Sequence, residues 1–127
     1  SMKELKKEEI INQYIRSGLI RYETTLSGDY KKGNKEYPKT LKVFKYLEKN
    51  LEIAKETLPL LFEHENVEVR AIASAHCLAL GICVKEAEEI LNEIANNEKY
   101  GIFSFTAQMT LKVWKEGNLK IYQKDKN

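Results

Sequence analysis

The chain has 127 residues, of which 43% are hydrophobic and 31% are charged, and its net charge is +2. This length supports one domain with a single core and excludes two. No apolar run approaches the roughly 20 residues that span a bilayer, and the first residues are too charged for a signal peptide. We therefore expect a cytoplasmic protein without membrane contact, in which Ser1 is a tag remnant ahead of the native Met2.

The first predicted helix covers residues 5–26. Its apolar side chains are spaced by three and four residues, as one face of a helix requires. Gly18 lies inside this pattern and is expected to be a tolerated weak point. Residues 27–34 contain two glycines and are predicted to form a loop.

The second predicted helix covers residues 35–50. Pro38 falls in its first turn, where a missing N–H does no harm. Two stripes of side chains follow helical spacing on this helix. The apolar stripe consists of Leu41, Phe44, Leu47 and Leu51. The basic stripe consists of Lys35, Lys39, Lys42, Lys45 and Lys49.

Four more helices are predicted in the rest of the chain. They cover residues 51–63, 67–80, 85–96 and 102–115. Pro59 must remove a backbone hydrogen bond and bend the first of these helices. Gly81 can terminate the second, and Gly117 marks the end of the last. Residues 123–127 are expected to be frayed.

The second half of the chain contains an approximate internal duplication. Residues 51–80 superimpose on residues 84–114 at an offset of 33 to 34, so that Leu58 falls on Leu91. Each copy reads helix, polar turn, helix, which is typical of stacked helical hairpins. We therefore predict a single all-α domain, a solenoid of about three hairpins. The expected core between hairpins is Leu58, Leu61, Val69, Ala73, Leu80, Leu91, Ile94, Phe103, Ala107 and Trp114.

The turn and helix at residues 65–73 resemble the HEAT-repeat pattern, in which a polar turn precedes Val-Arg and an alanine-rich second helix. Pro59 in the preceding helix also fits this resemblance. The repeat period is shorter than the roughly 40–47 residues of HEAT units and nearer the tetratricopeptide length. The tetratricopeptide signature residues are absent, so the HEAT-like interpretation is preferred.

A closer resemblance covers most of the chain. It is carried by residues 28–34, by Val69-Arg70 with His76, and by residues 105–117, which end in Met-Thr-Leu-x-x-Trp-x-x-Gly. These stretches resemble a bacterial family usually labelled domain of unknown function twenty-nineteen. The resemblance implies a HEAT-like helical fold and a bacterial source, and it implies no activity.

The candidate catalytic or metal-binding residues are His64, His76, Cys77 and Cys83. Adjacent helical residues point about 100° apart, so His76 and Cys77 do not face each other as base and nucleophile. We expect His76 to pack between hairpins with one ring nitrogen bonded. The four residues lack metal-ligand spacing, and both cysteines are expected to be reduced. No cofactor, metal or enzymatic activity is predicted, and only an unexpected cluster of these residues would favour catalysis.

The predicted partner-binding surface is a row on the second helices, which usually line the concave side of a solenoid. Within it, Arg70 is expected to bond an acidic or carbonyl group of the neighbouring turn and so lock hairpin to hairpin. Gripping a ligand is the alternative role for Arg70. The row in the 34-residue register consists of Arg70, Ser74, Leu78, Ser104, Gln108, Lys112 and Lys115.

Charge is unevenly distributed along the chain. Residues 1–50 contain 12 basic and 7 acidic side chains, whereas residues 51–100 contain 4 basic and 10 acidic side chains. The lysine stripe suggests contact with nucleic acid that weakens steeply with salt. The acidic region suggests a face that neutralises a basic nuclease, as bacterial immunity proteins and antitoxins do. That face consists of Glu52, Glu56, Glu63, Glu86, Glu89 and Glu93.

These patterns favour a non-enzymatic protein–protein interaction module of the bacterial cytoplasm, either a monomer or a weak homodimer. An immunity-type inhibitor is its most specific version. The alternative function is a helical-repeat protein that binds nucleic acid through the lysine stripe.

Overall fold

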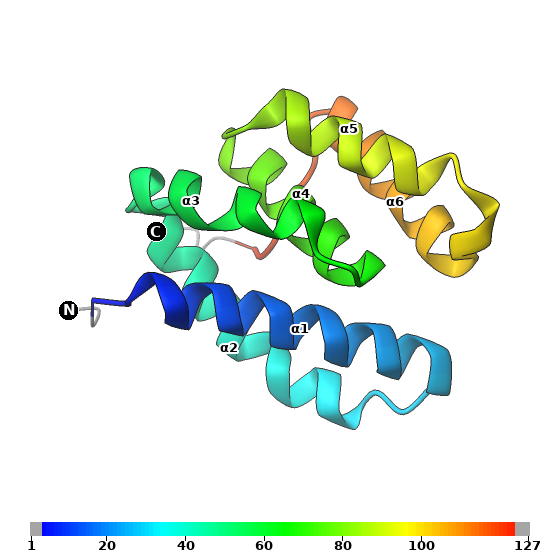
Figure 1. Cartoon of the computed structure of the whole chain (residues 1–127), viewed down its shortest axis with the longest axis horizontal. Helices are drawn as coiled ribbons and strands as arrows, with labels where there is room; N and C mark the ends of the chain where they lie inside the picture. Colours follow the sequence, from blue (N-terminus) through cyan, green and yellow to red (C-terminus); the bar gives the residue numbers. More distant parts are fainter. Residues whose placement is uncertain (1–3, 124–127) are drawn as a thin grey trace.

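The computed structural model describes residues 4–123, and all regular secondary structure in this part of the chain is helical (Figure 1). The predicted all-α class is therefore confirmed. The α-helices are α1 (Lys7–Ser27), α2 (Lys31–Glu48), α3 (Leu51–Thr57), α4 (Val67–Leu80), α5 (Val84–Ala95) and α6 (Ile102–Lys115). The 3₁₀ helices are η1 (Leu58–Glu63) and η2 (Glu98–Tyr100). The fraying predicted for residues 123–127 falls outside this description except at Gln123, and the interpretation of Ser1 also concerns a residue outside it.

The helices pair in chain order around α4. The pair α1 and α2 lies lowest in Figure 1, α3 and α4 lie in the middle, and α5 and α6 lie uppermost. Helix α4 contacts α1 on one side and α5, α6 and η1 on the others. No helix within residues 4–123 has the length and apolarity that crossing a membrane requires.

Helix α4 has the predicted bounds because an asparagine caps its first turn and a glycine ends it. The Asn66 side chain accepts hydrogen bonds from the backbone N–H groups of Glu68 and Val69, at 2.8 and 3.2 Å. This N-cap satisfies donors that have no partner within the helix. At the other end, Gly81 adopts the left-handed conformation with φ 71°, which a residue without Cβ accommodates most easily.

Pro59 interrupts the third helix, as predicted. The α-helix ends at Thr57, and the chain continues as the 3₁₀ helix η1. Proline has no N–H to donate, and its ring obstructs the α-helical hydrogen bond one turn earlier. The tighter 3₁₀ turn accommodates this loss over a short stretch.

Helix α2 begins four residues earlier than predicted. The carboxylate of Asp29 accepts the backbone N–H of Lys31 at 3.2 Å, and the carbonyl of Tyr30 accepts the N–H of Asn34 at 2.9 Å. These two bonds start the helix ahead of Gly33, so the predicted loop shrinks to a short turn. Pro38 consequently lies inside α2 rather than in its first turn.

Gly18 is a packing requirement rather than the tolerated weak point that was predicted. It lies where α1 crosses α4, and a Cβ added there would stand 2.5 Å from Cγ2 of Val69 and 2.6 Å from its Cα. No real side chain fits at those distances. The crossing therefore depends on glycine because the two backbones approach too closely for any larger residue.

The predicted inter-hairpin core is largely confirmed. Eight of its ten members are buried, while Leu80 and Trp114 are only partly buried and pack against the others. Helix α1 adds Ile10 and Tyr14, both fully buried. Leu51 was predicted to be buried but is 40% exposed, because the chain turns at Asn50 and starts α3 in a new direction.

Candidate binding groove

The predicted partner-binding row is wrong at three of its positions. Ser74, Leu78 and Ser104 are buried, so they cannot contact a partner. The Ser104 hydroxyl and the Gln108 amide both donate to the carbonyl of Ala95 at the end of α5, at 2.8 and 2.9 Å. This face of the second helices therefore packs inside the molecule. Lys112 and Lys115 are exposed, as expected.

A groove lies on a neighbouring face of the same helices. It is lined by Tyr37 and Phe44 of α2, Ala75 and Ala79 of α4, and Thr110 of α6. Ala75 and Ala79 each follow one residue after the predicted positions on α4, which rotates the face by about 100°. The groove contains cavities of about 470, 370 and 140 Å³.

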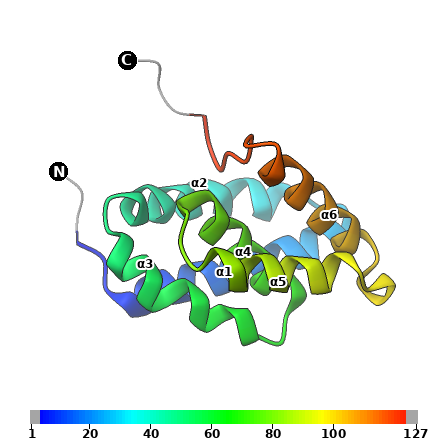
Figure 2. The ribbon, with the colours of Figure 1, turned by 90° about the horizontal axis from the view of Figure 1, so that it is seen from above.

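The chain's own C-terminal segment, Leu119–Gln123, lies in this groove. Figure 2 shows it on the side of the molecule where α2 and α6 lie. Ile121 lines all three cavities, and its carbonyl accepts a hydrogen bond from the hydroxyl of Tyr37 at 2.9 Å. Leu119 packs against the main core.

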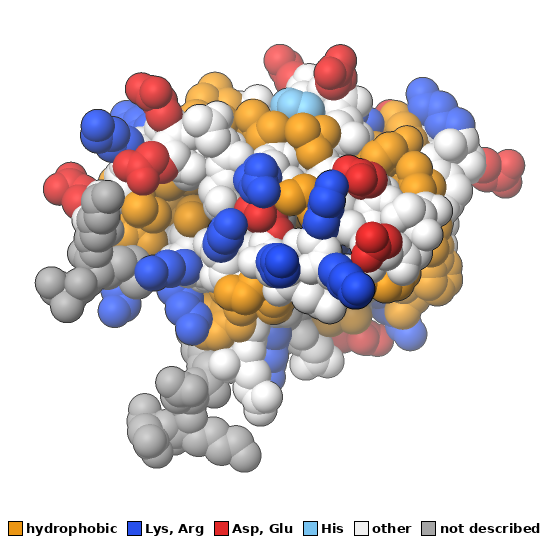
Figure 3. Space-filling model, turned by 90° about the horizontal axis from the view of Figure 1, so that it is seen from below, with side chains coloured by type: hydrophobic (Ala, Val, Ile, Leu, Met, Phe, Trp, Pro, Cys, Tyr) orange, Lys and Arg blue, Asp and Glu red, His pale blue; other side chains and the backbone are white. Residues whose placement is uncertain are grey.

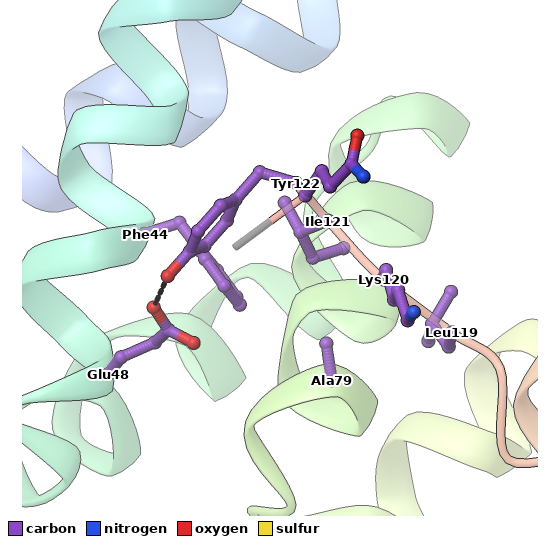
Figure 4. Close-up of a pocket in the computed structure, with 8 residues that line it drawn as sticks. Phe44, Glu48, Ala79, Leu119, Lys120, Ile121 and Tyr122 are labelled. Carbon is purple, nitrogen blue, oxygen red and sulfur yellow. Dashed lines mark hydrogen bonds between the residues drawn. The ribbon is translucent and has the colours of Figure 1, made fainter. Parts of the chain in front are cut away.

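Tyr122 is the most specific contact of the C-terminal segment (Figure 4). Its hydroxyl bonds the carboxylate of Glu48, and its ring meets Phe44 edge-on with centroids 5.9 Å apart. The ammonium group of Lys45 lies 4.8 Å from the centre of the same ring. The segment is thus recognised by an aromatic residue, a carboxylate and a cation, all from α2.

The turn after α6 directs the chain into the groove. Gly117 takes the left-handed conformation with φ 78°, and its N–H donates to the carbonyl of Trp114 at 2.9 Å. The N–H of Asn118 donates to the carbonyl of Val113, also at 2.9 Å. These bonds end the helix and reverse the chain.

His76 lies beneath the groove and packs as predicted. Its Nδ1 is 2.7 Å from the hydroxyl of Tyr14, and its ring meets Tyr14 and Phe44 edge-on. This bond occupies Nδ1, and Nε2 bonds to no residue from 4 to 123. Burial, and then the charge of Arg21, lower the pKa of His76 to about 3.

The two cysteines have the properties of packing residues. Both are free, and burial raises the pKa of Cys77 and of Cys83. A thiol with a raised pKa is a poor nucleophile because it holds little thiolate. Within residues 4–123, no three His, Cys, Asp or Glu side chains are grouped as a metal site requires.

Arg70 ties two successive turns together, but the carbonyls that it bonds belong to its own turn, and the neighbouring turn supplies a tyrosine hydroxyl in place of the predicted acidic or carbonyl group. One guanidinium nitrogen donates to the carbonyls of His64 and Glu65, at 2.8 and 3.0 Å. The other donates to the hydroxyl of Tyr100 at 3.1 Å, in the turn between α5 and α6. These bonds occupy the guanidinium within the molecule.

Two buried carboxylates were not predicted. Glu36 accepts hydrogen bonds from Gln13 at 2.6 Å and Arg16 at 3.0 Å. Burial opposes its ionisation, but these bonds and the nearby charges keep the pKa of Glu36 below its usual value. Glu68 lies 3.4 Å from Arg21, and burial raises the pKa of Glu68. Spacing along one helix gives no signal for the burial of either, because the hydrogen-bond partners of Glu36 and the ion-pair partner of Glu68 lie on α1.

The lysine stripe lies on the surface of α2, and all five of its side chains are exposed. Figure 3 shows Lys and Arg side chains gathered on the lower face of the molecule, where α1 and α2 lie. Lys39 pairs with Glu36 at 3.8 Å, and Lys45 covers Tyr122. The other three lysines form no ion pair with any residue from 4 to 123.

The six glutamates of the predicted acidic face are all exposed. Two of them are partly neutralised by neighbours: Glu52 pairs with Lys55 at 3.1 Å, and Glu56 pairs with Lys7. The three on α5 form no ion pair within the described part of the chain.

The second helices, Tyr37 and the C-terminal segment with Tyr122 thus meet in this groove. Comparison with family models, with curated proteins and with solved structures gave no match to this chain. The residues that line the groove are therefore the guide to its function.

Proposed function

We propose that the chain is a non-enzymatic protein-binding module built from HEAT-like helical hairpins. One observation carries the proposal: the groove between α2, α4 and α6 holds a non-helical stretch of polypeptide, the segment Leu119–Gln123. A surface that binds one such segment through side-chain and main-chain contacts has the chemistry to bind another.

The HEAT-like arrangement is supported by two features. Each pair of helices contacts the next through α4, and Arg70 joins the turn before α4 to the turn before α6. The second helix of every pair contributes to the groove. The bacterial cytoplasm is the proposed setting and rests on the family resemblance.

A binding role also suits the titratable groups near the groove. The low pKa of His76 leaves it neutral near pH 7, and burial raises the pKa of Tyr14 well above its usual value. Neither group changes protonation near neutral pH, as a general acid or base would.

The test is a pull-down from bacterial cytoplasm with the full chain as bait, with and without nuclease. Ala79→Arg places a long charged side chain in the groove. Asn96→Arg adds the same group at an exposed position outside the groove. We expect a nuclease-resistant protein to be retained by the wild type and by Asn96→Arg and lost with Ala79→Arg. Equal retention by all three baits would contradict the proposal.

An immunity-type inhibitor is the most specific version of this proposal. It is supported by the exposed glutamates of α5, which are free to meet a basic protein. In that version the captured protein is a basic nuclease, and replacing Glu86, Glu89 and Glu93 together by Gln releases it. Retention of the nuclease by the triple variant would show that the acidic face does not bind it.

Nucleic-acid binding is the second candidate. The observation that favours it is that Lys35, Lys42 and Lys49 are exposed without ion pairs to other described residues. Phosphate contacts of this kind release counterions, so binding should weaken steeply with salt. Replacing the three lysines by Glu should abolish binding to a labelled oligonucleotide, whereas Ala79→Arg should not.

A further inference from the structure

We propose that the C-terminal segment Leu119–Gln123 is an internal ligand that occupies the groove until a partner displaces it. The partner would present a segment of the same chemistry: aliphatic, any residue, aliphatic, tyrosine. This inference rests on the proposed function and adds both the class of partner and the regulation of the groove.

Within the described residues, side-chain contacts and one main-chain hydrogen bond hold the C-terminal segment. Leu119 packs against the core, the Tyr37 hydroxyl bonds the carbonyl of Ile121, and Tyr122 contacts α2. The segment forms no helix, so no helical backbone hydrogen bonds break when it leaves the groove. Such irregular segments open at a lower free-energy cost than core helices.

The segment fills the groove incompletely. Cavities of about 470 and 370 Å³ remain beside Ile121. The larger of the two is shown in Figure 4 between Ala79, Phe44 and the segment. Both cavities are open to solvent, so the groove has room for more polypeptide than the segment supplies.

Two polar groups that line the groove have no partner within residues 4–123. Ser17 and His76 line the 370 Å³ cavity. The Ser17 hydroxyl and Nε2 of His76 bond to no residue from 4 to 123, and neither atom is fully buried. A partner segment could bond both groups with its main chain, as in other modes of peptide recognition. The C-terminal segment uses only the Tyr37 hydroxyl in this way.

The contacts of the segment define which partner fits. Its tyrosine must meet Phe44, Lys45 and the Glu48 carboxylate, and the residue before it must be aliphatic to fill the space of Ile121. Lys120 is exposed, so the position between the two aliphatic residues is unrestricted.

The test uses the full chain and a fluorescent, capped hexapeptide of sequence Asn-Leu-Lys-Ile-Tyr-Gln. In the double variant Ile121→Ala with Tyr122→Ala, the segment loses its anchors and the groove becomes available. Because apparent affinity falls with the fraction of the competent state, we expect the peptide to bind the double variant at least tenfold more tightly than the wild type. Asn96→Arg, at an exposed position outside the groove, is the control and should bind like the wild type.

Two further measurements make the result decisive. Adding Ala79→Arg to the double variant should abolish peptide binding, and replacing the peptide tyrosine by Phe should weaken it by removing the bond to Glu48. In the wild type, excess peptide should accelerate amide hydrogen exchange in residues 119–123.

Equal affinity of the wild type and the double variant, or no binding by a double variant with native circular dichroism, would overturn the inference. A wild-type dimer that exchanges its C-terminal segments would assign the groove to a second copy instead. If the pull-down partner is lost with Ala79→Arg but retained equally by the wild type and the double variant, the proposed function stands and the displacement fails.

Discussion

On the side of α4 that faces α1, the helices approach so closely that only glycine fits at residue 18. On the side that faces the groove, the same helix leaves cavities next to an irregular segment of chain. Both sides are built from small and apolar residues, so composition does not separate them. The two sides differ in what covers them: a regular helix covers one, and an irregular segment covers the other. We therefore expect the α1–α4 contact to contribute more to the free energy of unfolding than the groove does. The groove is expected to exchange the segment that it binds.

The largest expected effect comes from the α1–α4 side. Tyr14→Ala removes a fully buried ring and the hydrogen bond to His76. By analogy with other large-to-small core substitutions, we expect a loss of about 3–5 kcal/mol in the free energy of unfolding. Tyr30→Ala is the matched control, because Tyr30 is 60% exposed and should change stability by less than about 0.5 kcal/mol. Chemical denaturation measures both, and a loss below about 1 kcal/mol for Tyr14→Ala would mean that this contact is not the stable one.

The next effect is a pH dependence of stability that originates at His76. Its pKa is about 3 in the folded chain and about 6.5 when unfolded. Between these values the unfolded state binds more protons, so stability falls as pH falls, by about 1.4 kcal/mol per pH unit between pH 6 and 4. Glu36 adds to this loss below its unfolded pKa, because its pKa is lowered on folding.

The contribution of His76 is isolated by comparing the wild type with His76→Gln across the same pH range. The variant should show a shallower dependence by about that slope, since Glu36 and Glu68 titrate in both proteins. Parallel curves would show that the imidazole does not resist protonation in the folded state.

A smaller effect is expected at the helix crossing. Gly18→Ala must push α1 away from Val69, and overpacking of this kind costs about 1–3 kcal/mol, partly offset by the better helix propensity of alanine. Gly33→Ala provides the matched control within α2, where the new Cβ meets only ordinary contacts with Thr24 at 3.6 and 3.9 Å. That variant should be stabilised by up to about 1 kcal/mol. A loss of stability with Gly18→Ala and a gain with Gly33→Ala would show that the α1–α4 contact in particular has no room for a Cβ. A change of the same sign in both variants would contradict this.

The smallest effect is expected in the groove itself. Ile121→Ala with Tyr122→Ala removes partly buried side chains that support no helix. We expect a loss of about 1 kcal/mol or less in thermal or chemical unfolding, as for other sites at the surface. A loss above about 3 kcal/mol would show that the segment belongs to the core and is not free to leave.

Local chemistry made the helices predictable. Helix α4 was predicted at its observed bounds because Asn66 and Gly81 are strong start and stop signals. Helix α6 was also predicted at its bounds. The start of α2 was missed because the Asp29 cap outweighed the two glycines that suggested a loop.

The groove was harder to predict than the helices. The repeat register identified helices that line the groove but selected a face of them about 100° away from the groove. The offset aligns equivalent positions in two repeats, but it does not show which neighbouring element covers those positions. The C-terminal segment gave no periodic signal, and its partners Tyr37 and Glu48 lie 84 and 74 residues earlier in the chain. Contacts of this range depend on the finished packing of all three helix pairs.

The course of the C-terminal segment gives the groove a polarity. The chain leaves α6 and lines a cavity with Leu119 beside Thr110, and three residues later it places Tyr122 against Phe44 of α2. A displacing peptide that keeps these contacts must run in the same direction, with its aliphatic end toward α6 and its tyrosine toward α2. The same residues in reversed order would leave the Glu48 carboxylate without its hydroxyl partner. Discrimination between a sequence and its reverse is therefore a property that the fold imposes on whatever the groove accepts.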